Sequence, residues 1–218
     1  MTPVVAAAAL LVLVAFVAGT ILNVRKGREL MRWMQGGLPL LGERASVRWL
    51  GSTAVELFIR EAKPPFEEVK LVLFMEPRDV PWLWALGRLG GRRDTLILRA
   101  RLRRPPRVAF EVLDPKSWSG RDALRGGSLN RWSVRGPTSP GDLATYFEEP
   151  SGLPPAEALS GLARRTGLEV RRLSLRASDP HFQLHLALPR PGADARAFFE
   201  AVRALGDRAR VAAAEGGH

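Results

Sequence analysis

PVVAAAALLVLVAFVAGTIL, residues 3–22, is a run of twenty residues without a charged side chain, and eleven of them are Leu, Ile, Val or Phe. A helix rises about 1.5 Å per residue, so this run is long enough to cross the roughly 30 Å hydrocarbon layer of a bilayer. The sequence therefore predicts a transmembrane anchor over residues 1–22. The rest of the chain is expected to be a domain held at a membrane.

A cleaved signal peptide is the competing interpretation of this run. Such a peptide carries positive charge before an apolar core of about 7–15 residues, followed by a small-residue cleavage site. Val17-Ala18-Gly19 resembles that site, but the run is longer, and its basic cluster follows it: Arg25, Lys26, Arg28 and Arg32. Lys and Arg beside a span stay on the cytoplasmic side. We therefore expect a single-pass protein of the cell membrane, with its N-terminus outside and its C-terminal domain in the cytoplasm.

Residues 23–37 continue with helical spacing until Gly36-Gly37. At about 100° per residue, Leu30, Met31 and Met34 share one face, and the arginines lie on the opposite one. This basic amphipathic pattern is typical of a juxtamembrane helix in the headgroup layer. It predicts five lipid-facing residues: Arg25, Lys26, Arg28, Arg32 and Trp33. The alternative is that the span runs on as a straight helix whose lower part packs on the domain.

The composition indicates a folded domain and limits its chemistry. With 46% hydrophobic and 25% charged residues, the chain has an ordinary globular composition. The absence of cysteine excludes disulfides, thiolate metal sites and a cysteine nucleophile. The net charge is +11, and 29 of the 33 basic residues are Arg, a bias that a GC-rich genome also produces. The position of the charge is therefore more informative than its total.

Residues 38–115 are predicted to form an antiparallel sheet with one helix. Apolar residues alternate with period two over 46–49, 55–60 and 69–75, and the short breaks between these runs indicate a meander. The third run is apolar on both faces, which favours a central strand covered by a helix. That helix is expected over 77–91, capped by Asp79, with an inward stripe consisting of Trp82, Ala85, Leu86 and Leu89. Two further strands are expected over 96–103 and 108–112, joined as a hairpin.

The second half of the chain is less regular. Residues 116–153 are rich in Pro and Gly and are expected to be an irregular connector, with a strand at 129–134 and a short helix at 142–149. Residues 154–210 predict helix, strand, strand and helix within the same domain, with Asp194 capping the last helix. Residues 211–218 are expected to be a disordered tail. The order helix, strand, strand occurs twice, so the predicted class is α+β with a largely antiparallel sheet, helices on one face and two candidate αββ units.

No motif in this sequence specifies catalysis, a cofactor or a metal, and none of these is predicted. His181 and His185 share one face of a strand, but about 3.3 Å per residue separates them by roughly 13 Å, too far to hold one ion. We expect both to be solvated. No phosphate-binding loop of the GxxxxGK[ST] kind is present.

Two surfaces are candidates for interaction. Arg99, Arg101 and Arg103 share one strand face and form a basic row, with Glu111 expected across the hairpin as partial neutraliser. No aromatic residue alternates with them, so lipid headgroups or an acidic protein segment fit this row better than a nucleic acid does. Trp84 and Arg88 are expected on the far side of the 77–91 helix, as an exposed interface pair or under a second layer.

The leading hypothesis is a membrane-anchored interaction or accessory module that binds anionic lipid, another membrane-associated protein, or both. The first alternative is a membrane-tethered hydrolase or transferase, which would have a deep pocket lined by several of five carboxylates: Asp79, Asp94, Glu111, Asp114 and Asp142. The second is a membrane-associated nucleic-acid binder, with affinity falling steeply in salt. Ala15 and Gly19 form a single small-xxx-small pair, which is too little to predict an oligomer.

Overall fold

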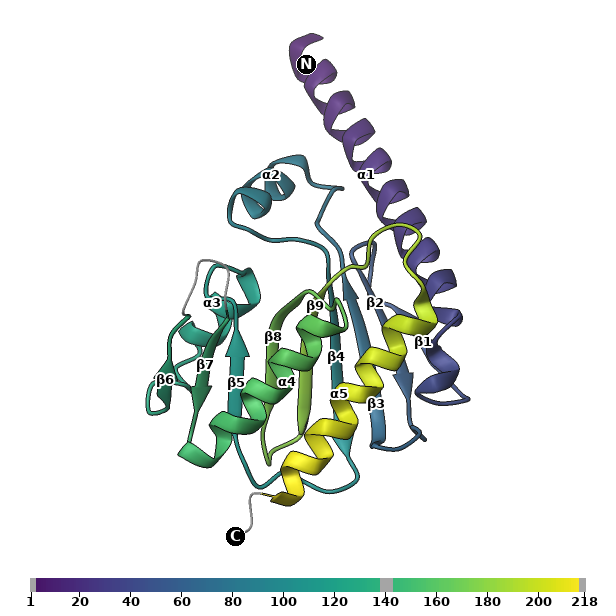
Figure 1. Ribbon diagram of the computed structural model, residues 1–218. Coiled ribbons are helices and arrows are strands. Elements are labelled where there is room, and N and C mark those ends of the chain that lie inside the picture. Colours follow the sequence, from purple (N-terminus) through teal and green to yellow (C-terminus); the bar gives the residue numbers. More distant parts are fainter. Residues whose placement is uncertain (1–2, 138–142, 216–218) are drawn as a thin grey trace.

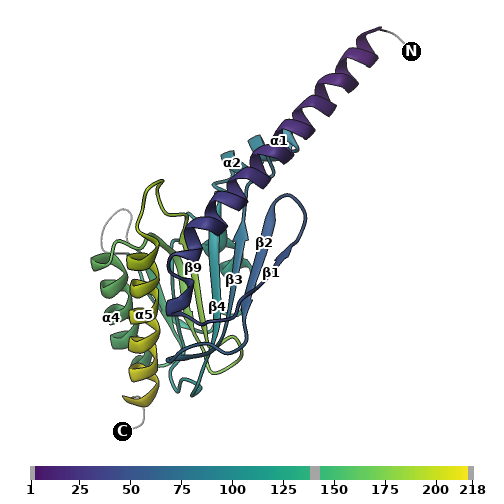
Figure 2. The ribbon, with the colours of Figure 1, turned by 90° about the vertical axis from the view of Figure 1, so that its right-hand side faces the viewer.

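The computed structural model describes residues 3–137 and 143–215 and has an α+β fold (Figure 1). Its described strands form one antiparallel sheet of nine, in the order β1-β2-β3-β4-β9-β8-β5-β7-β6. Helices α4 and α5 lie side by side across one face of that sheet, and α1 projects beyond it (Figures 1 and 2). The predicted fold class is confirmed.

The first three strands form the predicted meander, because β1 pairs with β2 and β2 pairs with β3. The strands are β1 (Ser46–Trp49), β2 (Ala54–Ile59), β3 (Phe66–Phe74), β4 (Thr95–Leu102), β5 (Phe110–Leu113), β6 (Ser133–Arg135), β7 (Ala144–Phe147), β8 (Val170–Leu175) and β9 (Phe182–Ala187).

The helices begin and end at recognisable signals. The backbone N–H of Arg196 donates to the Asp194 carboxylate at 2.8 Å, so Asp194 caps the last helix as predicted. Gly167, with φ of +72°, ends α4 in a conformation that favours glycine. The helices are α1 (Pro3–Gln35), α2 (Pro81–Leu89), α3 (Trp118–Arg125), α4 (Leu153–Arg165) and α5 (Ala195–Glu215), with single 3-10 turns η1 (Leu38–Leu40) and η2 (Pro150–Gly152).

The main core lies between the sheet and the α4–α5 layer. Phe66, Phe110 and Phe182 from the sheet and Phe199 from α5 are fully buried there. A Cβ on Gly206 of α5 would be 2.3 Å from the ring of Phe66, so the helix backbone rests directly on that ring. The predicted strand alternation supplies this buried face, because successive side chains of a strand point to opposite sides.

Helix α1 is one continuous helix that runs through Gly27. Its first part, up to Ala18, protrudes from the domain, and the helix as a whole is long and apolar enough to cross a membrane. The buried residues of α1 begin at Gly19 and follow at helical spacing: Gly19, Asn23, Gly27 and Met34. Residues 23–35 therefore pack on the domain as a straight extension of the span, which was the second of the two interpretations (Figure 2).

Several predicted packings are wrong. Helix α2 has no buried residue and does not cover β3, and the cap position is Val80 rather than Asp79. Strands β4 and β5 are not a hairpin, because β9 and β8 lie between them, whereas β8 and β9 pair directly. The two αββ units are thus present in chain order but are paired differently.

The segment 116–153 contributes more regular structure than expected. It supplies α3 and the strands β6 and β7, and the helix predicted at 142–149 is instead β7, paired with β5. Asp142 lies outside the described residues. Helix α5 continues to Glu215, past the expected start of the tail at residue 211, and residues 216–218 of that tail also lie outside them.

Candidate functional site

Two features meet at the end of the sheet from which α1 projects. The first is a polar cluster between α1, α2 and the turns beside them. We call it the α1–α2 cluster, and its members are Asn23, Lys26, Glu76, Arg78, Trp84, Arg88 and Asp94. The second is a pocket on the sheet face opposite α4 and α5.

Asp94 is the centre of the α1–α2 cluster. Its carboxylate accepts hydrogen bonds from the Arg78 guanidinium at 2.8 and 3.1 Å, from the backbone N–H of Glu76 at 2.7 Å, and from the Lys26 ammonium. Burial alone would raise the pKa of Asp94, but the hydrogen bonds from Arg78, Lys26 and the Glu76 N–H outweigh it and hold the pKa below its usual value. Asp94 therefore stays ionised and ties α1 to the start of β4.

The buried Asn23 makes a second connection between α1 and the domain. Its amide donates to the Glu76 carbonyl at 3.2 Å, and its side-chain oxygen accepts from Arg78 at 3.1 Å. Asn23 is fully buried, so these bonds satisfy a polar group that burial would otherwise penalise. The direction in which α1 leaves the domain is thus fixed by hydrogen bonds as well as by packing.

Trp84 faces this cluster, and the opposite side of α2 faces outward. The indole N–H of Trp84 donates to the buried Glu76 carboxylate at 2.6 Å, and the Arg88 guanidinium lies 5.7 Å from the ring centre. The predicted inward stripe is wrong in its direction. The apolar residues that α2 turns to the outside are Trp82, Leu83, Leu86 and Leu89, which are 55%, 51%, 65% and 87% exposed.

Of the five residues predicted to face lipid, some are exposed and others contact the domain. Arg25, Arg28 and Arg32 are exposed on one side of α1. Lys26 instead pairs with Asp94. Trp33 is half-buried: its indole N–H donates to the Ala193 carbonyl at 2.7 Å, and its ring packs against Phe198. Three of the five are therefore free to meet headgroups, and two hold α1 on the domain.

The three arginines of the predicted basic row also have different surroundings. Arg99 lines the pocket on the sheet. Arg101 pairs with Asp179 at 3.2 Å, and Arg103 donates to the backbone carbonyls of Phe66 and Ala62. Glu111 does not face this row. It is fully buried and accepts hydrogen bonds from two arginines on the β8 side, Arg172 and Arg176.

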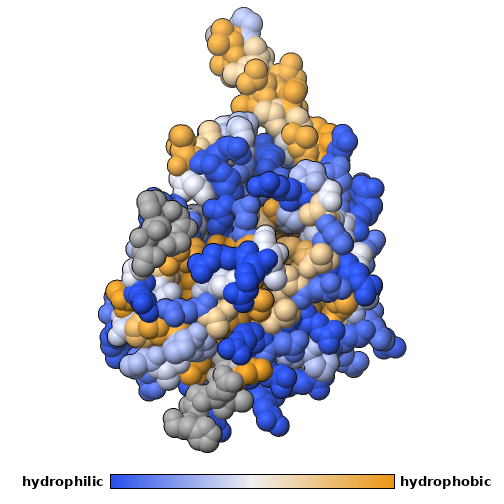
Figure 3. Space-filling model, viewed as in Figure 1, coloured by the Kyte–Doolittle hydropathy of each residue, from blue (hydrophilic) through white to orange (hydrophobic). Residues whose placement is uncertain are grey.

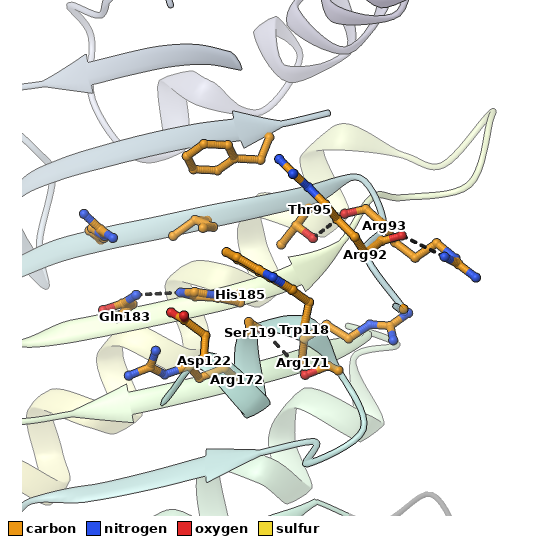
Figure 4. Close-up of a pocket in the computed structure, with 15 residues that line it drawn as sticks. Arg92, Arg93, Thr95, Trp118, Ser119, Asp122, Arg171, Arg172, Gln183 and His185 are labelled. Atoms are coloured by element: carbon orange, nitrogen blue, oxygen red, sulfur yellow. Dashed lines mark hydrogen bonds between the residues drawn. The ribbon is translucent and has the colours of Figure 1, made fainter. Parts of the chain in front are cut away.

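The pocket, which we call the basic pocket, has a volume of about 220 Å³. Strands β4, β8 and β9 form its floor, and α3 and the turn after α2 form its walls (Figure 4). Five arginines and one carboxylate line it, together with apolar and neutral polar side chains. The residues that carry its chemistry are Arg92, Arg93, Arg99, Arg171, Arg172, Asp122, Phe74, Ile97, Trp118, Gln183 and His185.

His185 is the least expected member of the basic pocket. It is buried, not solvated as predicted, because α3 covers this part of the sheet. Burial, together with the charges of Arg172 and Arg99, lowers the pKa of His185 to about 3, so the ring is neutral near pH 7. Its Nε2 lies 2.5 Å from the Gln183 amide nitrogen (Figure 4), and its buried Nδ1 has no hydrogen-bond partner within the described residues.

Sequence reasoning found Arg99, but it missed the rest of the basic pocket. Trp118, Arg172 and His185 come from a helix and two strands that are far apart in the chain. Only the pairing of β4 with β9 and of β9 with β8 brings them together. The available signal was the alternation of strand 181–188, which places Gln183 and His185 on one face.

The described residues include no group of three His, Asp or Glu side chains placed to hold a metal ion. Of the five carboxylates that an enzyme site was expected to use, Asp79, Asp94, Glu111 and Asp114 do not line the basic pocket, and Asp142 lies outside the described residues. No protein family model and no curated protein matches this chain.

Proposed function

We propose that this protein is a single-pass membrane-anchored interaction module. Its basic α+β domain lies against the cytoplasmic surface of the cell membrane, where it binds anionic lipid and another membrane-associated protein. The observation that carries this proposal is the position of α2, whose exposed apolar side lies next to the projecting part of α1. Figure 3 shows hydrophobic surface along that part of α1 and, just below it, at α2.

The length of α1 supports a position of α2 at the membrane boundary. The protruding residues 3–18 span about 24 Å at 1.5 Å per residue, roughly 6 Å less than the hydrocarbon layer. The span is completed only if the boundary lies about one turn beyond Gly19. At Gly19 the helix touches the backbone of Arg78, three residues before α2 begins. Helix α2 therefore lies at the depth where the hydrocarbon ends.

The residues at that depth suit the lipid interface. Trp and Leu on one side of a short helix insert between headgroups, where a Trp ring is favourable. The exposed Arg25, Arg28 and Arg32 follow on α1, within reach of anionic headgroups. The α1–α2 cluster joins the two elements, so the span and the interfacial helix are held as one unit.

The content of the basic pocket favours a binding module over the hydrolase or transferase. General acid–base catalysis requires titratable groups held in the site, and two carboxylates are a common arrangement. Here one carboxylate, Asp122, lies among five arginines, and the histidine is neutral. Such a site recognises an anion.

The depth of α2 in a bilayer tests the proposal. The chain has no cysteine, so Leu86→Cys in the full chain can be labelled at one position with an environment-sensitive dye. In vesicles of neutral and anionic lipid we expect lipids brominated near the headgroup to quench this dye strongly. A dye on Val134→Cys is the matched control, because Val134 is 57% exposed on β6, away from α2. Equal quenching of both dyes, at the level of free dye in water, would exclude α2 from the interface.

A further inference from the structure

Two arginines of the basic pocket have no salt-bridge partner among the described residues. Arg172 pairs with Glu111, and Arg171 lies 3.9 Å from Asp114. Arg92 and Arg99 have no carboxylate within 4 Å in the described part of the chain, although Arg92 is half-buried. A guanidinium matches the oxygens of a phosphate with paired hydrogen bonds, so two unpaired arginines at one cavity indicate an anionic ligand.

An apolar side of the same pocket limits the kind of anion. Phe74, Ile97 and Trp118 line it, and the Arg92 guanidinium lies 5.9 Å from the centre of the Trp118 ring. Trp118 and Phe74 are both partly open to solvent, at 49% and 40% exposure. The volume of about 220 Å³ is below the roughly 300–1,000 Å³ of sites for drug-sized ligands. The space suits one charged group joined to one small apolar or ring-shaped group.

His185 is a buried and uncharged member of the basic pocket. The residue is 5% exposed, it lines the basic pocket, and its Nδ1 has no hydrogen-bond partner in the described structure. With the Gln183 amide donating to Nε2, the proton of the neutral ring is on Nδ1. Nδ1 is covered by protein, so a ligand in the pocket meets the uncharged ring of His185 and not this nitrogen.

We propose that the basic pocket binds a small phosphate monoester that carries an apolar or ring-shaped group. Arg92 and Arg99 hold the phosphate, and the group it carries packs against Trp118. The first turn of α3, which includes Trp118, also lines the pocket. The partial positive charge at this helix N-terminus favours an anion.

A phosphate monoester at this place has two chemical sources. The pocket wall at Gly91–Arg93 follows directly after α2, so the headgroup of a lipid such as phosphatidic acid is one source. A soluble phosphate ester is the other. Binding of a soluble ester needs no membrane, so the basic pocket can be tested separately from the interfacial position of α2.

The test uses the full chain in micelles of an uncharged detergent and phenyl phosphate as the probe, with binding measured by titration calorimetry. We expect saturable binding that is tighter than the binding of inorganic phosphate, and none for phenol. Arg99→Gln should weaken binding about tenfold or more, because it removes a charge-assisted hydrogen bond. Trp118→Leu should remove most of the preference for phenyl phosphate over inorganic phosphate.

Arg101→Gln is the matched control. Arg101 is two residues from Arg99 on the same face of β4, but it pairs with Asp179 and does not line the pocket. We expect its effect to be less than about twofold, because a surface charge outside the site contributes little. Thermal unfolding of each variant shows that it is folded. Equal weakening by both arginine variants, or no saturable binding of phenyl phosphate by the folded chain, would overturn the proposal.

The same titration in vesicles identifies the source. The full chain is reconstituted into phosphatidylcholine alone and into phosphatidylcholine with one-tenth phosphatidic acid. If the lipid headgroup occupies the pocket, phosphatidic acid will raise the apparent Kd of phenyl phosphate for the wild-type chain. If the source is soluble, the two vesicles will give the same Kd. Either result supports the pocket and assigns its ligand.

Discussion

His185 makes the stability of the domain depend on pH. An unfolded histidine has a pKa near 6.5, and the pKa of His185 in the folded state is about 3. The folded form of this group therefore binds its proton more weakly, and its stabilising contribution is present above pH 6.5 and is lost as the pH falls toward 3. The groups that face it include Arg99, Arg172 and Asp122, and the two arginines oppose its protonation.

A comparison of wild type with His185→Gln isolates this effect. For the wild type we expect the free energy of unfolding to fall by about 2 kcal/mol more between pH 7 and pH 5 than it falls for the variant. Asp and Glu contribute little change in this interval, because their ordinary pKa values are near 4. Denaturant unfolding of the full chain in uncharged micelles measures the free energy of unfolding of both proteins at each pH. Parallel pH curves for the two proteins would mean that His185 is accessible to solvent and titrates normally.

At Gly19, α1 approaches the backbone of the turn before α2 closely. A Cβ there would lie 2.1 Å from the Arg78 carbonyl oxygen, which is backbone and cannot move as a side chain does. Gly19→Leu should therefore force the two elements apart and weaken the hydrogen bonds of Arg78 and Asn23. Overpacking of this kind costs about 1–3 kcal/mol, which thermal unfolding in micelles would show.

Ala18→Leu is the control for this element, because Ala18 is the residue next to Gly19 on α1 but is exposed. It adds the same side chain to the apolar run without facing the domain. We expect its melting temperature to stay within about 1–2 °C of wild type, since surface substitutions contribute little. The assignment of α1 packing at Gly19 is wrong if both variants have the melting temperature of wild type.

The helices and strands show what periodicity can and cannot predict. The spacing of apolar residues located α2 and most of the strands, and it identified Trp82, Leu86 and Leu89 as one face. Periodicity shows which residues share one face of a helix, but it does not show what that face packs against. The exposed face of α2 was therefore predicted to pack on the sheet. Likewise, the sequence indicated a hairpin of β4 and β5, but β4 lies between β3 and β9, and β9 is more than seventy residues later in the chain.

The candidate site was predictable only where it is local in sequence. Arg99 stood out because it alternates with apolar residues in one strand. That Arg99 has no salt bridge within the described residues could not be predicted, because the expected partner Glu111 pairs instead with Arg172 and Arg176. The buried state of His185 depends on α3, which lay in the segment expected to be irregular.

Across the whole molecule, many of the 29 arginines have structural partners. Arg78, Arg88, Arg172 and Arg176 hold buried carboxylates, and Arg103 donates to backbone carbonyls. The net charge of +11 therefore overstates the charge that is free to act on a partner. Arginines that can meet a ligand or a lipid lie in the basic pocket and on the exposed side of α1 after residue 22.

The orientation that we propose for the molecule in the membrane rests on the second of these places. Arg25, Arg28 and Arg32 are exposed within about ten residues of the end of the span, and Lys and Arg so placed are retained in the cytoplasm. Protease added outside intact cells should therefore leave the domain uncut. Digestion of the domain from outside, or a mature N-terminus near Thr20, would contradict both the orientation and the anchor.

A triple variant, in which these three arginines become Gln, should give a mixed or inverted orientation. Because they are exposed, their loss should change the free energy of unfolding by no more than about 1 kcal/mol each, and Lys26 remains to pair with Asp94. The control replaces Arg125, Arg164 and Arg165, which are equally exposed but lie far along the chain from the span. It removes the same total charge. If both triple variants keep the wild-type orientation in protease protection, the arginines beside the span do not set the topology.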